Sequence, residues 1–435
     1  MRRVCAPQKP TMYIERLHIQ DFRCFADTEF TLNYPGRKYP RGKKAPKLDN
    51  VNLFLGDNGT GKTSAFRAAV IAVLSPILNN SGFVTEYSVR RQMAGATTEV
   101  KPASLRAKTV FVPPNRLLNH PDYLGFVGEI SSRITVVGDT ESIHLDPLAE
   151  ESDDHFRALF TAKSPEIFLA AYAANRRTAR PEGYSEGNRT ARYQRVAGIF
   201  EDHVGLMPFR QGQLELVNLD HIDEADEILD KLLPEEVQTW DANFISRLTP
   251  LPFSALSDGY RTFIGWVWDL LVQIARVTPS GTPLYSMSGI VIVDEIDLFL
   301  HPDWQRTVIA RIATTFPNLQ FLFSTHSPLV AGSVESSNIY VLEDDPDNEG
   351  ASVVKQYTEH IQGLSADQIL TGSYFGLRTT RAQPLVDDLN DLLAKAVGSD
   401  DPKIAIEYLT RLNLGSERDE ADRNADQKKL TATSS

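Results

Sequence analysis

Cysteine is almost absent from this sequence of 435 residues, and the two present, Cys5 and Cys24, do not form a CxxC pair. Disulfide frameworks and structural zinc sites need several cysteines at short spacings, so both are excluded. A long apolar run is also lacking, because the most apolar stretch, 263–274, is interrupted by Asp269 and is too short to cross a bilayer. The chain start has no apolar core of a secretory signal. These absences predict a cytoplasmic protein without a membrane segment.

Positive charge is in deficit, with 45 Lys plus Arg against 57 Asp plus Glu and a net charge of -12. Over most of the surface this charge disfavours unspecific binding to polyanions such as DNA and RNA. Any nucleic-acid contact is therefore expected in a local basic patch. An apolar share of 42% is sufficient for a large core, which predicts a globular chain.

Strand and helix signals alternate along much of the chain. Strand signals occupy 13–30, and a buried-strand run at 51–55 is followed by a Gly-rich turn and a helix at 64–74. The second half continues the alternation with a helix at 258–277, a strand at 290–293, a helix at 303–316 and a strand at 321–324. This order predicts an α/β fold, with a mixed or parallel sheet flanked by helices.

We expect four segments along the chain. Residues 1–80 form an N-terminal lobe, 81–250 an irregular, α-rich insert, 251–342 a second lobe, and 343–435 an extension of short C-terminal helices with a polar tail. The insert also contains an acidic helical segment at 220–236. No heptad repeat appears, so long coiled-coil arms are excluded.

The segment at 56–63 is GDNGTGKT, which has the G-x-x-x-x-G-K-[ST] spacing of a phosphate-binding loop. Glycines let main-chain N–H groups wrap phosphates, and the following helix N-terminus adds positive potential. Lys62 is expected to reach the β and γ oxygens, and Thr63 to ligate Mg²⁺. A Gly-rich turn without a ligand is disfavoured by the strand before the loop and the helix after it. The expected contacts of the nucleotide are Gly56, Asn58, Gly59, Thr60, Gly61, Lys62, Thr63 and Ser64.

Two acids, Asp294 and Glu295, end an apolar strand. The strand places Asp294 beside the phosphate loop, where it holds Mg²⁺ through water, and Glu295 is then positioned to orient or deprotonate the attacking water. An apolar strand that ends in two acids is common by itself. Its occurrence together with a phosphate loop is what indicates a nucleotide site. His326 follows the strand at 321–324 and is positioned for the γ-phosphate, with a structural histidine as the alternative.

The segment at 256–261 is LSDGYR and precedes a strongly apolar helix. Ser257 is a natural N-cap, and the free N–H groups of a helix start form an anion site. An ordinary capped helix is the alternative interpretation.

In this order, the phosphate loop, LSDGYR, VIVDEID followed by LHP at 300–302, and STHSP resemble the ABC-type ATPases of the SMC, RecF and OLD group. The resemblance implies an ABC-type P-loop ATPase head that uses ATP and Mg²⁺. It implies that Glu295 is the catalytic carboxylate and His326 the switch histidine. It also implies that Ser257 and Gly259 contact the γ-phosphate bound by another copy, so that ATP joins two heads into a dimer.

Three further segments, FRCF at 22–25, AAYAANRR at 170–177 and GLSADQIL at 363–370, are similar to ATPase subunits of bacterial anti-phage systems, in particular Septu and Septu-associated retrons. This resemblance implies a role in anti-phage defence with a partner nuclease of the HNH type, and it implies that Arg23 lies near the nucleotide. A RecF- or SMC-like ATPase acting directly on DNA in repair or recombination is the alternative function. Gln92 is a candidate for the family's Q-loop glutamine.

Six arginines lie between positions 176 and 195. One interpretation is contact with phosphates of DNA, RNA or the nucleotide itself, with Arg176, Arg177 and Arg180 as the candidates for DNA or RNA. The other is a solvated loop that pairs with the acidic segment at 220–236. No HNH, Ser-His-Asp or Cys-His arrangement is visible, so any nuclease activity is expected from another polypeptide.

Overall fold

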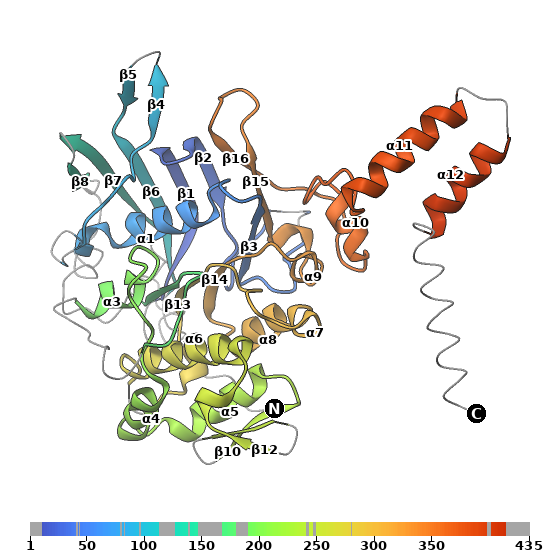
Figure 1. Cartoon of the computed structure of the whole chain (residues 1–435). Helices are drawn as coiled ribbons and strands as arrows, with labels where there is room; N and C mark the ends of the chain where they lie inside the picture. The colour runs from blue at the N-terminus through green and yellow to red at the C-terminus, as the bar shows by residue number, and fades with distance from the viewer. Residues whose placement is uncertain are drawn as a thin grey trace, which may run out of the picture. The chain divides into compact units, whose positions relative to one another are not determined.

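The computed structural model (Figure 1) describes residues 11–112, 127–146, 168–179, 190–397 and 402–414, except 41, 43, 79–80, 82, 95–96, 138–139, 241–242, 247–248 and 280. The chain divides into two compact units, the first made of 1–369 with 373–375 and the second of 370–372 with 376–435. The expected segments 1–80, 81–250 and 251–342 all fall within the first unit. In the part of the chain that the structure describes, no helix is long and apolar enough to span a membrane.

A six-stranded sheet forms the centre of the first unit. Its order is β16 (Ser352–Lys355), β15 (Ile339–Asp344), β3 (Val51–Gly56), β14 (Leu319–Ser324), β13 (Gly289–Val293) and β9 (Leu169–Tyr172). All neighbours are parallel except β16, which is antiparallel to β15. The expected α/β fold with a mostly parallel sheet is confirmed, and the sheet continues beyond position 342 through β16.

Side chains of the parallel strands alternate between two hydrophobic cores, one on each face of the sheet. In β13, Val291 and Val293 enter the first core, whereas Ile290 and Ile292 enter the second. A strand covered on both faces must be apolar at every position. This requirement explains why the central strands appear in the sequence as continuous apolar runs.

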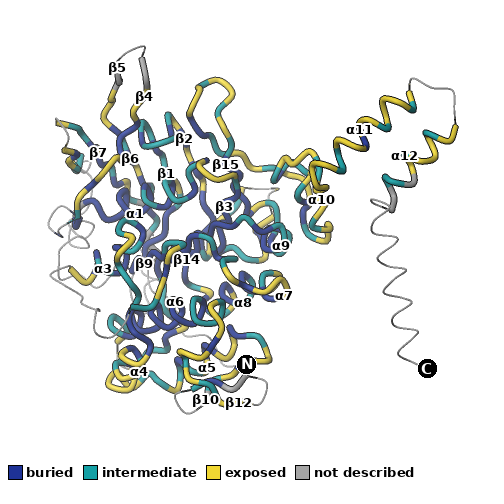
Figure 2. The backbone as a smooth tube through the Cα atoms, viewed as in Figure 1, coloured by how far each residue is buried: buried dark blue, intermediate teal, exposed yellow. Residues whose placement is uncertain are grey.

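Helices cover the first core, and Figure 2 shows buried backbone concentrated in the central strands and in α6. The covering helices are α4 (Phe209–Asn218), α5 (Ile222–Leu232), α6 (Asp258–Ala275) and α8 (Val308–Thr315). Both tryptophans of α6, Trp266 and Trp268, are fully buried. A long apolar helix is therefore held against the sheet, with its N-terminus at the predicted anion site.

The second core lies around α1 (Lys62–Leu78), which packs between the central sheet and a second sheet. Except for Arg67, residues 65–75 of α1 are buried, so this helix is apolar on more than the one face that the sequence indicated. Phe54 of β3 anchors this core, with ring centroids 5.0 Å from Phe66 and 5.3 Å from Tyr340. The phosphate loop is thus flanked by two firmly packed elements.

The second sheet is antiparallel and draws most of its strands from the insert. Its order is β2 (Phe25–Thr31), β1 (Thr11–Phe22), β6 (Ala103–Val112), β7 (Val127–Val137) and β8 (Thr140–Leu145). The insert also contributes the hairpin β4 (Arg91–Ala94)–β5 (Thr97–Val100), the meander β10 (Val237–Trp240)–β11 (Asn243–Ser246)–β12 (Thr249–Leu251), and α3 (Ala191–Ala197). It therefore differs from the expected α-rich insert. Strands such as β6 bury one face and alternate with polar residues such as Arg106 on the other, a short-range pattern that is weak in sequence.

The helix expected at 303–316 is divided into α7 (Pro302–Gln305) and α8. The Gln305 side chain donates to the Leu300 carbonyl at 2.9 Å, and the Thr307 hydroxyl donates to the Trp304 carbonyl at 3.3 Å. Such side-chain bonds to the backbone compete with helical hydrogen bonds. The remaining helices are α9 (Pro328–Ala331), α10 (Ala366–Thr371), which crosses the division between the units, and α11 (Gln383–Val397) and α12 (Pro402–Leu414) of the second unit.

Acidic helix α5 generates a test of the packing. Burial, followed by repulsion from Asp230 and Asp223, raises the pKa of Asp226 from 3.8 to about 6. The folded state therefore binds this proton more tightly than the unfolded chain, so stability falls as pH rises from 3.8 to about 6 and stays lower above that range. We expect Asp226→Asn to raise Tm by about 1–2 °C near pH 7.5 and to leave it unchanged near pH 4.

Thermal unfolding followed by circular dichroism at the two pH values measures this difference. Glu236→Gln, at an exposed position after α5, is the matched control because it removes the same charge from the surface. An equal effect of Asp226→Asn at both pH values would contradict the burial argument.

Candidate nucleotide-binding site

The phosphate loop connects β3 to α1, as the sequence predicts. Gly56, Gly59 and Gly61 have φ angles of 147°, 90° and 102°, a region that side chains with a Cβ rarely adopt. A Cβ at Gly61 would lie 2.3 Å from the Cys24 sulfur. Glycine is therefore required here both for the backbone conformation and for the close approach of the β1–β2 turn.

Lys62 begins α1 and is 6% exposed. Its ammonium donates to the carbonyls of Gly56 at 2.7 Å and Asp57 at 2.9 Å. Burial lowers the pKa of Lys62, while the nearby Asp294 and Glu295 act in the opposite direction. The loop thus orients a desolvated cation at its own centre, where it attracts phosphate oxygens strongly.

Asp294 joins three segments of the chain. The Thr63 hydroxyl donates to one of its carboxylate oxygens, Oδ2, at 2.5 Å, and the Ser324 hydroxyl donates to the other, Oδ1. Asp294 is only 3% exposed. A hydroxyl and a carboxylate that converge in this way are the hard oxygen donors that Mg²⁺ prefers, so the residues present fit the expected metal ion.

Glu295 has a left-handed backbone, with φ of 47°. For a residue other than glycine this conformation costs about 1–3 kcal/mol and persists only where the surroundings determine it. Here its N–H donates to the Ser324 Oγ at 2.7 Å, and its carbonyl accepts from Arg176 Nη2 at 2.8 Å. The side chain itself is half-buried. The turn is therefore held from two sides at the position where the sequence predicts the catalytic carboxylate.

His326 lies just beyond β14, at the same carboxyl edge of the sheet, and is half-buried. The neighbouring Thr325 hydroxyl donates to the Asp297 carboxylate at 2.5 Å, and the Ser327 hydroxyl accepts from the N–H of Leu329 at 3.1 Å. Parallel pairing of β13 with β14 sets this loop beside the Asp294 turn. The geometry agrees with a role at the γ-phosphate, which stays a prediction.

Ser257 is the N-cap residue of α6 and is exposed, and its side chain makes no capping hydrogen bond. Gly259, in the first turn of α6, packs against the loop after β13, where an added Cβ would lie 2.3 Å from the Phe299 carbonyl oxygen. The Ser257 hydroxyl therefore makes no hydrogen bond to the N–H groups at the start of α6. This property suits a serine that contacts a ligand from a second molecule.

Arg23 lies in the β1–β2 turn, with φ of 49°. The adjacent Cys24 sulfur is 3.8 Å from the Thr60 carbonyl oxygen, so this turn packs against the phosphate loop. Burial, followed by the charge of Arg67, lowers the pKa of Arg23. Its Nε is buried without a hydrogen-bond partner among the described residues. A cationic donor beside the loop supports the expected proximity of Arg23 to the nucleotide.

The expected contact of Arg176 with nucleic acid is wrong. Arg176 is 4% exposed, and its guanidinium is bound to main-chain carbonyls of the catalytic turn. Arg192 and Arg195 are each 8% exposed. Arg177 is exposed, and Arg180 lies outside the described residues. Charge counted along the sequence suggested a basic surface, whereas three of the four arginines of this cluster that the structure describes are buried.

The sequence did not indicate that Arg176 and Ser324 hold the Asp294–Glu295 turn. Ser324 ends the apolar run of β14 and begins the STHSP motif, and neither signal shows that its side chain turns toward Asp294. Gln92, the candidate Q-loop residue, lies exposed on β4, and its role stays untested.

The contact between α6 and Phe299 generates a prediction. In Gly259→Ala, the new methyl group must displace the loop at 299–302 or the first turn of α6, because main-chain atoms cannot move aside as flexible side chains do. We expect a loss of about 1–3 kcal/mol of stability and faster amide hydrogen exchange at 299–301. Gly198→Ala is the control, since its nearest neighbour, the Val204 carbonyl, is 4.0 Å away. Equal effects of both variants would count against a tight contact.

The chain is similar to several characterised proteins. It matches the Septu protein PtuA of Bacillus mycoides (strain KBAB4) with 25% identity over 395 residues, which cover 87% of this chain and 46% of that protein. It matches the Retron Vc95 probable ATPase of Vibrio cholerae serotype O1 biovar El Tor with 39% identity over 104 residues, which cover 24% of this chain and 20% of that protein. The chain thus spans less than half the length of these relatives. The expected resemblance to Septu and retron ATPases is confirmed.

Two solved structures are also similar. The SMC head bound to the C-winged helix domain of ScpA covers 79% of this chain and 97% of its own, with 15% identity and a TM-score of 0.43. The recombination mediator protein RecF covers 80% and 99%, with 8% identity and a TM-score of 0.40.

A family profile described as "AAA domain, putative AbiEii toxin, Type IV TA system" matches residues 51–332. This range is more than half of the 435 residues. It begins at β3 and includes the phosphate loop, Asp294, Glu295 and His326. The chain therefore belongs to the AAA-domain family of that description.

Proposed function

We propose that this chain binds and slowly hydrolyses ATP at the site formed by the phosphate loop and the Asp294–Glu295 turn. The observation that carries the proposal is the convergence of Thr63 and Ser324 on the buried carboxylate of Asp294, beside the ammonium of Lys62. Burying a carboxylate costs free energy of folding unless its oxygens have partners. Stability alone therefore does not require residues from three separate segments to meet at a buried carboxylate, and we take their meeting as support for a binding function.

In the proposed reaction, Lys62 and the loop N–H groups bind the β- and γ-phosphates, and Thr63 and Asp294 hold Mg²⁺. The metal ion, when bound, neutralises charge on the transferring phosphate oxygens. Glu295 orients a water molecule and accepts its proton as the water oxygen bonds to the γ-phosphorus. The bond from that phosphorus to the β–γ bridging oxygen breaks, so ADP and inorganic phosphate are released.

We further propose that the site is completed by a second copy of the chain. The exposed Ser257 hydroxyl, free of a capping bond at the start of α6, supports this arrangement. In a two-fold dimer each head would supply Lys62 to one ATP and Ser257 to the other. ATP would then hold two heads together, and hydrolysis would release them.

The names of the relatives support a role in anti-phage defence, because they belong to Septu and retron systems. In the proposed role, the ATP-bound assembly controls a partner effector, such as an HNH nuclease. The alternative of direct action on DNA loses part of its support, since Arg176, one of the three arginines expected at the nucleic acid, is buried.

Two substitutions separate binding from hydrolysis. We expect Lys62→Ala to weaken ATP binding about tenfold to a hundredfold, because charge-assisted hydrogen bonds to the phosphates are lost. Glu295→Gln should bind ATP normally but turn over about 10²–10⁴ times more slowly, because the general base is lost. Fluorescent ATP-analogue binding and phosphate release measure the two effects.

Glu349→Gln, at an exposed position, is the control for the Glu-to-Gln change. Normal turnover by Glu295→Gln would contradict the assigned role of Glu295. Unchanged ATP affinity of Lys62→Ala would contradict the phosphate-loop assignment.

Mixing two inactive variants tests whether the site is shared. Lys62→Ala and Ser257→Arg should each be inactive alone. In a mixed dimer one of the two sites has both Lys62 and Ser257 intact, so random pairing should restore about a quarter of wild-type turnover. Steady-state phosphate release across mixing ratios measures the recovery. A mixture that forms mixed dimers on a sizing column yet stays inactive would rule out sharing.

A further inference from the structure

Arg176 lies just after β9, at the edge of the sheet where the catalytic turn begins. The parallel pairing of β9 with β13 runs to Tyr172 opposite Val293, so the segments after both strands emerge side by side. Arg176 is 4% exposed. An arginine is rarely buried to this degree without a defined set of partners.

Its partners are main-chain carbonyls of the catalytic turn. Nη1 donates to the Asp294 carbonyl at 2.5 Å and to the Ala173 carbonyl at 3.1 Å, and Nη2 donates to the Glu295 carbonyl at 2.8 Å. The Asp294 and Glu295 carbonyls belong to the two peptide groups that flank Glu295. The planar guanidinium therefore holds both peptide groups at once, which a single ammonium cannot do.

This hold adds to main-chain hydrogen bonds of the same turn, in which the Asp294 N–H donates to the Tyr172 carbonyl at 2.8 Å and the Ile296 N–H donates to the Ser324 carbonyl at 2.9 Å. The φ of 47° at Glu295 is unfavourable for a residue with a Cβ. The direction of the Glu295 side chain follows from the orientation of the same two peptide groups. Arg176 on one side and Ser324 on the other thus determine where the carboxylate can reach.

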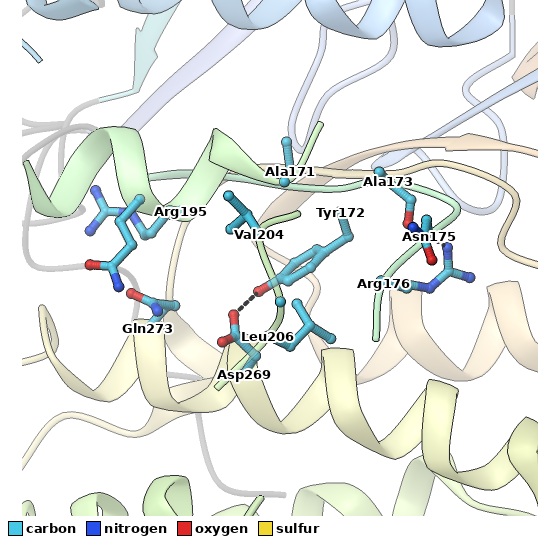
Figure 3. A pocket seen from close by; sticks show the side chains of 13 residues that line it. Ala171, Tyr172, Ala173, Asn175, Arg176, Arg195, Val204, Leu206, Asp269 and Gln273 are labelled. Carbon is cyan, nitrogen blue, oxygen red and sulfur yellow. Dashed lines mark hydrogen bonds between the residues drawn. The ribbon is translucent and has the colours of Figure 1, made fainter. Parts of the chain in front are cut away.

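A cavity of about 50 Å³ lies beside Arg176 (Figure 3). Arg176 and Arg195 line it on either side of Tyr172, whose hydroxyl donates to Asp269 at 3.0 Å. The Nε of Arg176 is buried without a hydrogen-bond partner among the described residues. Among the residues that the structure describes, the guanidinium makes no hydrogen bond to a carboxylate side chain, and its bonds go to the main-chain carbonyls of Ala173, Asp294 and Glu295.

We propose that Arg176 is a positioning residue that fixes the backbone of the catalytic turn and thereby the carboxylate of Glu295. The inference rests on the proposed ATPase function and deepens it. In this role Arg176 contacts the backbone of the turn, not the nucleotide. It affects the rate of hydrolysis through Glu295, whereas the affinity for ATP is determined by the phosphate loop.

Arg176→Lys is the principal test, because it keeps the buried charge and loses only the forked geometry. We expect its kcat to fall about tenfold to a hundredfold, the size of effect that a misplaced catalytic group produces. Its ATP affinity should stay within about twofold of wild type. Arg176→Met, which removes the donors altogether, should lower kcat at least as far.

Arg195→Lys is the matched control, since Arg195 lines the same cavity but donates to the Leu169 carbonyl in β9. It should leave kcat unchanged even if it lowers Tm. Amide hydrogen exchange at 294–296 should quicken in Arg176→Lys and not in Arg195→Lys. This readout reports on the backbone of the turn, and it remains available if Arg176→Met does not fold.

Wild-type kcat in Arg176→Lys, or equal losses of kcat in both lysine variants, would overturn the inference. If the wild-type chain neither binds nor hydrolyses ATP, the proposed function fails. Exchange at 294–296 then decides the matter by itself: unchanged exchange in Arg176→Lys overturns the hold on the turn, and faster exchange supports it.

Discussion

The buried carboxylate of Asp294 is the interaction on which the candidate site depends. It accepts hydrogen bonds from Thr63 at the start of α1 and from Ser324 at the end of β14, so it ties the phosphate loop to two neighbouring strands. A carboxylate that is 3% exposed is tolerated only with such partners. The Thr63 hydroxyl and the Asp294 carboxylate, which are hydrogen-bonded to each other in this structure, are also the groups expected to bind Mg²⁺.

This arrangement follows from how the sheet is packed. Because β3, β14, β13 and β9 are parallel neighbours, their carboxyl ends open at one edge, and polar residues that follow each strand meet there. Alternate side chains of these strands pack into two hydrophobic cores. One core lies under α6 and its neighbours, and the other lies around α1. Rigid packing on both faces keeps the edge residues within hydrogen-bond distance, and it supports a strained turn at Glu295 that an isolated loop would not retain.

The arginines after β9 illustrate how the same residue type takes opposite roles. Counted along the sequence, the cluster between 176 and 195 indicates a basic surface for nucleic acid. In the structure, Arg176 donates to carbonyls of the catalytic turn, and Arg195 lies over the ring of Phe168 with 5.3 Å to the centroid. Local charge pattern carries no information on burial, because burial depends on which distant segments cover the cluster. The antiparallel strands of the insert were underestimated for a different reason, since strands such as β6 bury only one face and their alternation of apolar and polar residues is a weak signal in sequence.

The sequence by itself determined the α/β class, the central strands and the phosphate loop, because each depends on short-range patterns: apolar runs, glycine spacing and a lysine at a helix start. It also identified Asp294, Glu295, His326 and Ser257 as candidates through motif order. Only the tertiary structure decided that Ser324 and Thr63 converge on Asp294, that Gly259 packs against the Phe299 carbonyl, and that Arg176 faces inward. Those contacts join residues that lie between 30 and 231 positions apart in the chain, and local composition carries no information on which distant residues meet.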